Sequence, residues 1–389
     1  MTLSPPLALD TSVDRLFEAP QKTSFFLFGP RGTGKTTWLR KNYSPDCFLD
    51  LLKASTFNRL LAHPDELQDL IPPAASTVVI DEVQKIPALL DEVHRLIETR
   101  KMNFVLSGSS ARKLKKKGVN LLAGRALTKS FFPLTALELK GKFNLQDCLK
   151  WGTLPGRFIV PAPEEFLESY VSTYLQEEVQ SEGLLRNLGA FRRFLEVASF
   201  SQAQPVVYSN IAHEAQIERK TIENYFSILE DLLIGSFIPV FSKKAKRELI
   251  AKRKFFFFDA GVYNCLRPKG PLDLESEAFG PALETLVFNE LRALNSYLGL
   301  GFDFFYWRTK DKFEVDLVLY GKQGLFALEI KNSPRTRPGD LEGLKQFKKD
   351  YPMAKCFLLN LSRAPAYDSE IQIIPAPLFF EDARKIFKA

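Results

Sequence analysis

The sequence contains few cysteines and no long hydrophobic run. Its 389 residues include four cysteines, which are widely separated and form no Cys-x-x-Cys pair. Such isolated thiols suit a reducing compartment and argue against a zinc site. No apolar stretch approaches the roughly 18 residues that a membrane helix needs, and no basic-then-apolar secretory signal is evident at the N-terminus. We therefore expect a cytoplasmic protein that has no membrane partner.

The chain also lacks a strong charge of either sign. Its 53 Lys and Arg residues exceed its 46 Asp and Glu residues by a net charge of +7, which permits nucleic acid as a partner without establishing it. The hydrophobic fraction of 45% and the charged fraction of 25% are those of a globular protein. The length predicts two or three domains. Phenylalanine is abundant, and the run Phe255–Phe258 predicts a buried strand.

The most informative motif is Gly-Pro-Arg-Gly-Thr-Gly-Lys-Thr at residues 29–36, which fits the P-loop pattern G-x-x-x-x-G-K-[ST]. An apolar run at 24–28 predicts the strand before it, and residues 37–41 predict the opening of a helix. This arrangement aims unpaired backbone N–H groups and a positive helix end at one anion. The residues expected to bind ATP are Gly29, Pro30, Arg31, Gly32, Thr33, Gly34, Lys35, Thr36 and Thr37.

A second motif, Thr-Val-Val-Ile-Asp-Glu at residues 77–82, resembles a Walker B strand. We expect Thr36 and Asp81 to hold Mg²⁺, and Lys35 to reach the β- and γ-phosphates. Glu82 would polarise the attacking water. Hydrolysis of a phosphoanhydride chiefly requires charge neutralisation and a positioned nucleophile, and these residue types supply both.

Two further features after the Walker B strand have open interpretations. The segment 103–110 predicts a third strand, and Ser107 or Ser109 at its end would sense the γ-phosphate or cap a helix. Arg125 would act as an arginine finger toward a neighbouring subunit, or it is a surface or salt-bridged arginine. The finger interpretation predicts a homo-oligomer, for which a hexamer is one candidate.

The pattern of elements predicts an α/β protein of three domains. Residues 1–145 read as a P-loop NTPase core with a mostly parallel sheet, which the family resemblance given below makes AAA+-like. Residues 146–245 read as a helical lid and a winged helix-turn-helix, with helices at 208–215 and 220–231 and a strand-like run at 234–240. This unit would contact a DNA groove or pack between protein domains. Basic runs at 112–117 and at 243–247, the second continuing to 252–254, are solvated loops or contacts for a phosphate backbone.

Residues 246–389 contain a second constellation of chemistry-bearing residues. Asp316 lies in one predicted strand, and Glu329 and Lys331 lie two residues apart in the next, after a tight turn at 321–324. A preceding amphipathic helix supplies Glu284. This is the pattern of PD-(D/E)xK nucleases, in which carboxylates hold Mg²⁺ and the lysine acts on water. A salt-bridged strand pair and a degenerate site that only binds DNA or metal are the alternatives.

The chain resembles a large family of prokaryotic AAA+-like ATPases with an uncharacterised C-terminal domain of restriction-endonuclease-like fold. The resemblance covers nearly the whole chain and implies a winged-helix middle. The sequence departs little from the family pattern. It has Gly-Thr-Leu-Pro at residues 152–155, where Gly-Gly-Leu-Pro is usual in the family. The matching segments are the P-loop with Asp81 and Glu82, residues 108–110, 122–125, 152–155, 170–175 and 257–261, and the pair of strands around Asp316 and Lys331.

These observations lead to one expected function and two rivals. We expect a Mg²⁺-dependent ATPase that acts on DNA as a motor or remodeller, with duplex or branched DNA as its partner. The first rival is a DNA nuclease whose cutting is licensed by ATP. The second is a signalling ATPase that binds protein and has no DNA activity.

Overall fold

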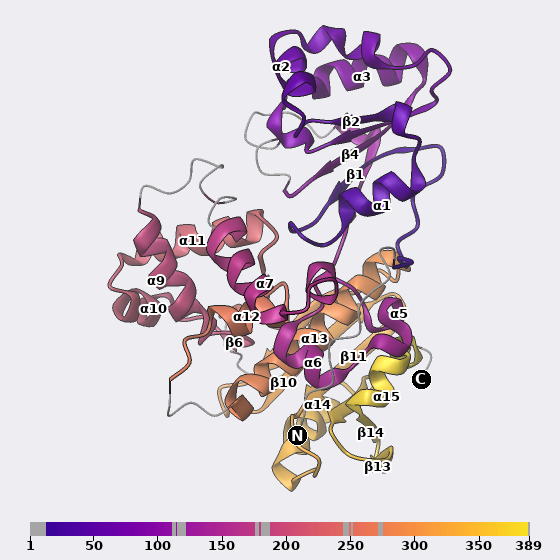
Figure 1. Cartoon of the computed structure of the whole chain (residues 1–389). Helices are drawn as coiled ribbons and strands as arrows, with labels where there is room; N and C mark the ends of the chain where they lie inside the picture. The colour runs from indigo at the N-terminus through magenta and orange to yellow at the C-terminus, as the bar shows by residue number, and fades with distance from the viewer. Residues whose placement is uncertain are drawn as a thin grey trace.

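A computed structural model describes residues 13–110, 114, 122–175, 179, 187–243, 249, 252–270 and 275–387. Within these ranges the protein is an α/β structure with three β-sheets (Figure 1). Residues 13–23 contain no helix, although the sequence suggests a short one within 1–20, of which 1–12 lie outside the described residues. Most of the basic runs at 112–117 and 243–247 also lie outside them. No helix in the described part of the chain is long and apolar enough to span a membrane.

The N-terminal sheet has five parallel strands in the order β2-β3-β4-β1-β5. Strand β4, which is the third strand predicted from the sequence, lies between β1 and β3. Helix α1 packs on one face, and α2 and α3 pack on the other, so this part has three layers (Figure 1). The elements are β1 (Ser24–Phe28), α1 (Lys35–Asn42), β2 (Phe48–Asp50), α2 (Ala54–Ala62), β3 (Thr77–Asp81), α3 (Leu89–Arg100), β4 (Asn103–Gly108) and β5 (Ala126–Ser130).

The middle of the chain is mainly helical. A short α-helix at Pro163–Ser169 is followed by a π-helix at Tyr170–Leu175. Ser209 and Asn210 are residue types that favour a helix cap, but Val207 precedes the first residue of the helix that begins at Tyr208, and no side chain caps it. The elements are α5 (Ala136–Leu139), α6 (Leu145–Trp151), α7 (Pro163–Ser169), α9 (Leu188–Ser199), β6 (Gln204–Pro205), α10 (Tyr208–Ala215), α11 (Arg219–Asp231), β7 (Gly235–Ile238) and β8 (Lys254–Phe257).

Strand β8 belongs to a small antiparallel sheet in the order β6-β8-β7. The predicted domain boundary between residues 245 and 246 falls between β7 and β8, although these two strands pair in this sheet. The run of phenylalanines forms the expected buried strand, since every residue of β8 is buried. Residues from β8 thus join the middle of the chain to the C-terminal part.

The C-terminal part contains a six-stranded mixed sheet in the order β13-β14-β12-β11-β10-β9. Strands β10 and β11 pair antiparallel through the predicted tight turn, with Gly321 opposite Gly324. Helix α14 packs on one face, and α13 and α15 pack on the other. The elements are α12 (Ala260–Leu266), α13 (Glu275–Tyr297), β9 (Asp303–Arg308), β10 (Glu314–Gly321), β11 (Gly324–Ile330), α14 (Glu342–Asp350), β12 (Lys355–Asn360), β13 (Ala366–Asp368), β14 (Ile371–Pro375) and α15 (Ala376–Glu381).

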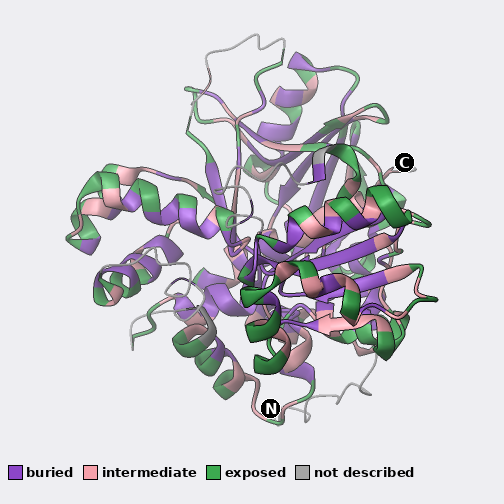
Figure 2. Cartoon of the chain, turned by 90° about the horizontal axis from the view of Figure 1, so that it is seen from above, coloured by how far each residue is buried: buried purple, intermediate pink, exposed green. Residues whose placement is uncertain are grey.

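Buried residues are concentrated on the sheet strands and on the inner sides of the helices, and the outer helical faces are exposed (Figure 2). One large hydrophobic cluster extends from α5 and α6 through α11 and β8 to α13 and the C-terminal sheet. The middle and C-terminal parts therefore share a core. The four cysteines are free thiols, as their spacing predicts.

Candidate nucleotide site and acidic cluster

The P-loop connects β1 to α1 at the carboxyl edge of the parallel sheet. Gly32 and Gly34 have φ angles of 77° and 90°, which glycine adopts without strain. A Cβ atom at Gly29 would lie 2.2 Å from the Phe131 carbonyl oxygen, so this position also needs glycine. The sequence fixes the loop through these three glycines, and α1 begins at Lys35.

The ammonium group of Lys35 lies inside this loop. Its Nζ donates to the carbonyl oxygens of Gly29 at 2.6 Å and Pro30 at 3.0 Å, and the side chain is buried. Thr33 Oγ1 also donates to Pro30 O at 2.9 Å. Among the other predicted contact residues, Arg31 is half-buried and Thr37 is exposed on α1. The loop is therefore a compact cradle that carries a cation at its centre.

Asp81 ends β3 beside the P-loop and joins two other predicted residues. Thr36 Oγ1 donates to Asp81 Oδ2 at 2.8 Å, and Ser107 Oγ at the end of β4 donates to Asp81 Oδ1. Carboxylate and hydroxyl oxygens are the ligands that Mg²⁺ prefers. The structure thus brings together the residues expected to hold the metal, and it places Ser107 beside them. Any helix that Ser107 or Ser109 would cap begins after residue 110, in a segment that lies mostly outside the described residues.

Glu82 follows Asp81 in a left-handed backbone conformation with φ of 61°. Burial raises the pKa of its carboxyl group, while Lys35 acts in the opposite direction. The Gln84 amide Nε2 donates to Glu82 Oε2 and, at 3.1 Å, to Ser109 Oγ. The Gln84 Oε1 atom is buried and has no hydrogen-bond partner. Sequence reasoning missed Gln84, and its position two residues after Glu82 is the only signal that could have found it.

Arg125 does not lie within the P-loop network. Its guanidinium forms a salt bridge with Glu98 on α3, and its side chain is partly exposed. In the isolated chain Arg125 is therefore a salt-bridged arginine, which is one of the two interpretations of the sequence. Its action on a neighbouring subunit stays a prediction.

Two residues from outside the motif hold the P-loop backbone. Arg15 is almost fully buried and donates to Thr33 O at 2.7 Å, to Phe132 O at 2.6 Å and to Glu138 Oε1 at 2.9 Å. Tyr170 in the π-helix donates from its hydroxyl to Arg31 O at 3.0 Å. The nucleotide loop is therefore in direct contact with the middle part of the chain.

The four residues of the predicted nuclease constellation converge at one end of the C-terminal sheet. Lys331 Nζ lies 2.5 Å from Glu329 Oε1. Asp316 Oδ2 accepts a hydrogen bond from Ile330 N at 2.9 Å. Burial and then repulsion from Asp316 raise the pKa of Glu284 to about 8, and the same causes raise the pKa of Glu329 well above its usual range. Asp316 and Glu329 are buried, and the side chain of Glu284 is 12% exposed.

Lys254 on β8 is a fifth member of this cluster, so the interpretation of residue 254 as part of a solvated or phosphate-binding basic run is wrong. Its Nζ lies 2.9 Å from Glu284 Oε2, 3.2 Å from Asp316 Oδ1 and 3.8 Å from Glu314 Oε1. Its side chain has 0% exposure. Burial lowers the pKa of Lys254, but the carboxylates outweigh burial and raise it. The available signal was that Lys254 directly precedes the phenylalanine run and so lies in the same buried strand.

This cluster does not fit a resident Mg²⁺ ion. No group of three His, Cys, Asp or Glu side chains in the described ranges is arranged to hold a metal. An ammonium group already lies between Glu284 and Asp316, and Mg²⁺ requires near-octahedral oxygen coordination. The ammonium group therefore occupies the position between these two carboxylates that a metal ion would need.

Comparisons with known proteins agree with the arrangement of the N-terminal part. Residues 21–140 match a family described as AAA domain. Together with the parallel sheet and the P-loop, this match defines an AAA+-like P-loop ATPase domain. Residues 131–276 and 279–379 match two domains of unknown function, DUF8612 and DUF4143.

Full-length similarity extends to an uncharacterised archaeal protein. "Uncharacterized protein MJ1544" of Methanocaldococcus jannaschii is 26% identical over 400 residues, which cover 90% of this chain and 86% of that protein. The Aeropyrum pernix ORC1 protein in complex with DNA is 15% identical and covers 64% of this chain and 87% of its own, with a TM-score of 0.28. Protein VC1899 from Vibrio cholerae is 11% identical, with coverages of 94% and 97% and a TM-score of 0.23. Structural likeness this weak carries no conclusion about function.

Proposed function

We propose that the protein hydrolyses ATP with Mg²⁺ and uses this reaction to act on DNA. The observation that carries the ATPase assignment is the junction of Thr36, Asp81 and Ser107 beside Lys35. Thr36 and Asp81 would hold Mg²⁺, which neutralises phosphate charge when it is bound. The chain's own residues supply the remaining parts of the reaction.

Lys35 would release the carbonyl oxygens of Gly29 and Pro30 and donate to the phosphates in their place. Glu82 would accept a proton from the attacking water at its carboxylate, and Ser107 would donate toward the γ-phosphate. Arg125 would leave Glu98 and stabilise charge at the site of a neighbouring subunit, which requires a homo-oligomer such as a hexameric ring.

The proposal that DNA is the partner rests on the order of the elements in the other two parts. The order α9-β6-α10-α11-β7-β8 and the sheet order β6-β8-β7 fit a winged helix-turn-helix. Arg219 and Lys220 are exposed at the start of α11, where such a unit would contact a groove. The order α13-β9-β10-β11-α14-β12 is compatible with a restriction-endonuclease-like domain.

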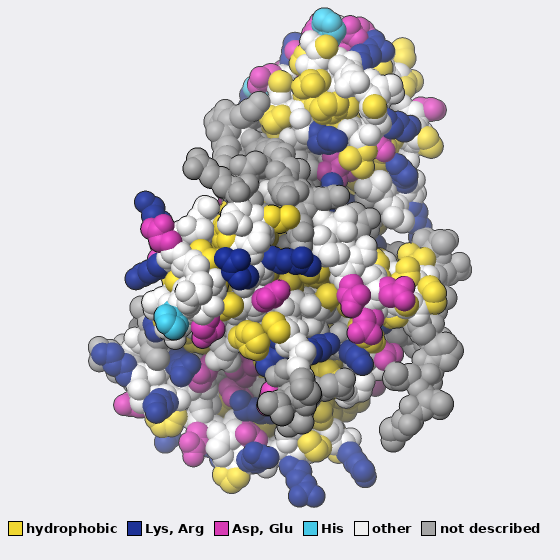
Figure 3. Space-filling view, turned by 60° about the vertical axis from the view of Figure 1, so that its left-hand side comes forward, with side chains coloured by type: hydrophobic (Ala, Val, Ile, Leu, Met, Phe, Trp, Pro, Cys, Tyr) yellow, Lys and Arg dark blue, Asp and Glu magenta, His cyan; other side chains and the backbone are white. Residues whose placement is uncertain are grey.

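A protein-binding ATPase is the second candidate, and the surface charge favours it. Arg219 forms an ion pair with Glu223 on the same helix, so one basic residue of α11 is already neutralised. On the face in Figure 3, basic side chains are interleaved with acidic ones and form no single continuous patch. The two candidates therefore differ in whether DNA binds and stimulates hydrolysis.

The test is ATP hydrolysis by the wild type with and without single-stranded, duplex or four-way-junction DNA. Lys35→Ala should abolish hydrolysis, and Glu82→Gln should lower kcat by about 10²–10⁴-fold, the usual contribution of a general base. Stimulation by one form of DNA, with salt-sensitive binding, supports the DNA assignment. Full activity in Lys35→Ala would refute the nucleotide site. Hydrolysis that is indifferent to all DNA would favour the protein-binding candidate.

A further inference from the structure

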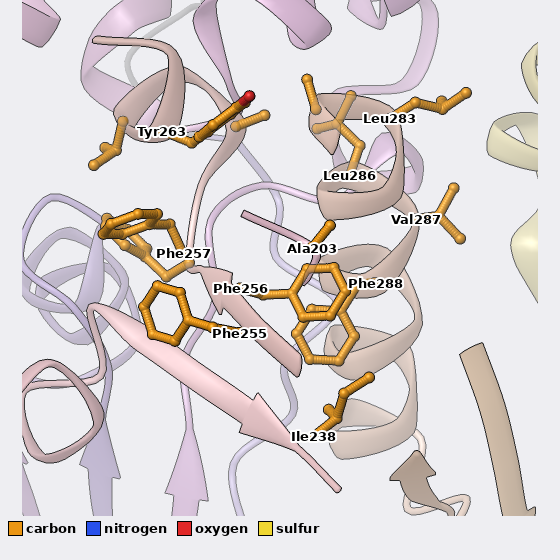
Figure 4. Packing of buried hydrophobic residues seen from close by; sticks show 14 of the residues in the cluster. Ala203, Ile238, Phe255, Phe256, Phe257, Tyr263, Leu283, Leu286, Val287 and Phe288 are labelled. Atoms are coloured by element: carbon orange, nitrogen blue, oxygen red, sulfur yellow. The ribbon is translucent and has the colours of Figure 1, made fainter. Parts of the chain in front are cut away.

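Strand geometry places Lys254 in the acidic cluster. Successive side chains of a strand point to opposite faces, so Lys254 and Phe256 share one face of β8. The Phe256 ring lies 4.3 Å from the Phe288 ring of α13. Phe255 and Phe257 point to the other side of the strand (Figure 4). The packing of Phe256 against α13 therefore sets the position of Lys254 beside Glu284 of the same helix.

The contacts of Lys254 are those of a central cation. Its ammonium group approaches carboxylates from two elements, Glu284 on α13 and Asp316 and Glu314 on β10. A fully buried ammonium group is stable only when such partners compensate its lost hydration. A divalent ion placed between Glu284 and Asp316 would meet this positive charge at close range. The ammonium group and a metal ion therefore exclude each other.

We infer that the ammonium group of Lys254 takes the place of a divalent cation in this cluster, so that the C-terminal part does not bind a catalytic metal and does not cut DNA. This inference goes beyond the proposed ATPase function and does not depend on it. The cluster acts instead as an ionic connection between the small sheet of β6, β7 and β8 and the C-terminal sheet. Lys331 and Glu329 pair beside it and leave the Lys254 contacts intact.

The experiment counts Mn²⁺ ions bound by the full chain in the absence of nucleotide, by titration calorimetry and by electron paramagnetic resonance. Mn²⁺ alone is the probe. The chains are the wild type, Asp316→Asn, Lys254→Met, and the double variant Lys254→Met with Asp316→Asn. Asparagine preserves an oxygen that can accept from Ile330 N, so Asp316→Asn is a matched control for charge. Because ATP is absent, failure of the ATPase proposal does not affect the result.

We expect the wild type and Asp316→Asn to bind the same number of Mn²⁺ ions. Lys254→Met should gain one ion, and the double variant should lose it again. Binding in the wild type that Asp316→Asn removes would overturn the inference, and so would a folded Lys254→Met chain that gains no ion. If Lys254→Met does not fold, the numbers of Mn²⁺ ions bound by the wild type and by Asp316→Asn still test the inference. Mn²⁺-dependent cleavage of duplex DNA by the wild type that Asp316→Asn abolishes also overturns it.

Discussion

Glu82 occupies a backbone conformation that glutamate rarely adopts. Its φ angle of 61° lies in the left-handed region, which costs a residue with a Cβ atom roughly 1–2 kcal/mol. Such strain persists where the surrounding structure determines the conformation, and it is common at functional sites. Asp81 before it is anchored by Thr36 and Ser107. The turn therefore directs Glu82 away from β3 and toward Gln84.

Gln84→Ala should shift the acidic limb of the pH profile of kcat for ATP hydrolysis to higher pH. The amide of Gln84 donates to the Glu82 carboxylate, and a hydrogen bond to the charged form favours that form. Without it the pKa of Glu82 rises further than burial already raises it, so less of the base is ionised at pH 6. The loss of kcat should be larger at pH 6 than at pH 8, as measured by phosphate release.

Ser109→Ala is the control for Gln84→Ala. Ser109 accepts from the same amide, but the hydrogen bond to Glu82 comes from Gln84, so the Ser109 variant should leave the acidic limb in place. If both variants shift the limb equally, the role of the Gln84 amide at Glu82 is refuted.

The order of elements was largely predictable, because strong local signals determine it. The P-loop, the three apolar strands and the glycine turn at 321–324 fix β1, α1, β3, β4 and the β10–β11 hairpin. Residues that act through distant contacts were not predictable. Lys254 lies in a hydrophobic run 62 positions before Asp316, and Arg15 meets Glu138 across 123 positions. No periodicity in the sequence encodes such pairings, since packing of separate elements creates them.

Helix α13 carries a carboxyl group whose protonation should control stability. Burial raises the pKa of Glu290 to about 8 from its ordinary value of 4.5, and its Oε2 accepts from Ala136 N at 2.8 Å. Between these values the folded chain retains a proton that the unfolded chain releases, so stability falls as pH rises through this window. Glu290→Gln should weaken this loss of stability with pH. The Tm of the variant minus the Tm of the wild type should therefore increase between pH 5 and pH 8.5.

Glu277→Gln on the same helix is the matched control, because Glu277 is exposed. The Tm of Glu277→Gln should equal the Tm of the wild type at every pH. Equal pH dependence of the wild type and the Glu290→Gln variant would show that Glu290 is already ionised in the folded chain.

At the scale of the whole molecule, the nucleotide loop is connected to the rest of the chain by buried polar contacts. Arg15 joins the loop to α5 through Glu138, and the Tyr297 hydroxyl at the end of α13 accepts from Phe132 N at 3.0 Å. Asp259 caps α12 and accepts from Thr153 N at 2.7 Å. A change in the P-loop can therefore reach both other parts of the chain through a few defined atoms.

Tyr170→Phe should weaken this communication. The variant removes the hydrogen bond to Arg31 O, and a net contribution of about 0.5–1.5 kcal/mol corresponds to roughly 2–12-fold in nucleotide affinity. Hydrogen exchange with a non-hydrolysable ATP analogue should show nucleotide-induced protection of residues 152–155 in the wild type and less in the variant. Tyr208→Phe, a half-buried tyrosine on α10 that contacts the Phe226 ring, should behave as the wild type. Full protection in Tyr170→Phe would exclude this route.

The central place of β1 has a consequence for synthesis of the protein on the ribosome. Strand β1 is the first strand of its sheet to be made, but it pairs with β4 and β5, which are made last. At translation rates of ~5–20 residues per second, the nascent β1 waits on the order of ten seconds for both neighbours. Its three phenylalanines remain without their sheet partners during that time. The nucleotide cradle therefore cannot be completed until β5 has left the exit tunnel, and the apolar strand is accessible to chaperones during this interval.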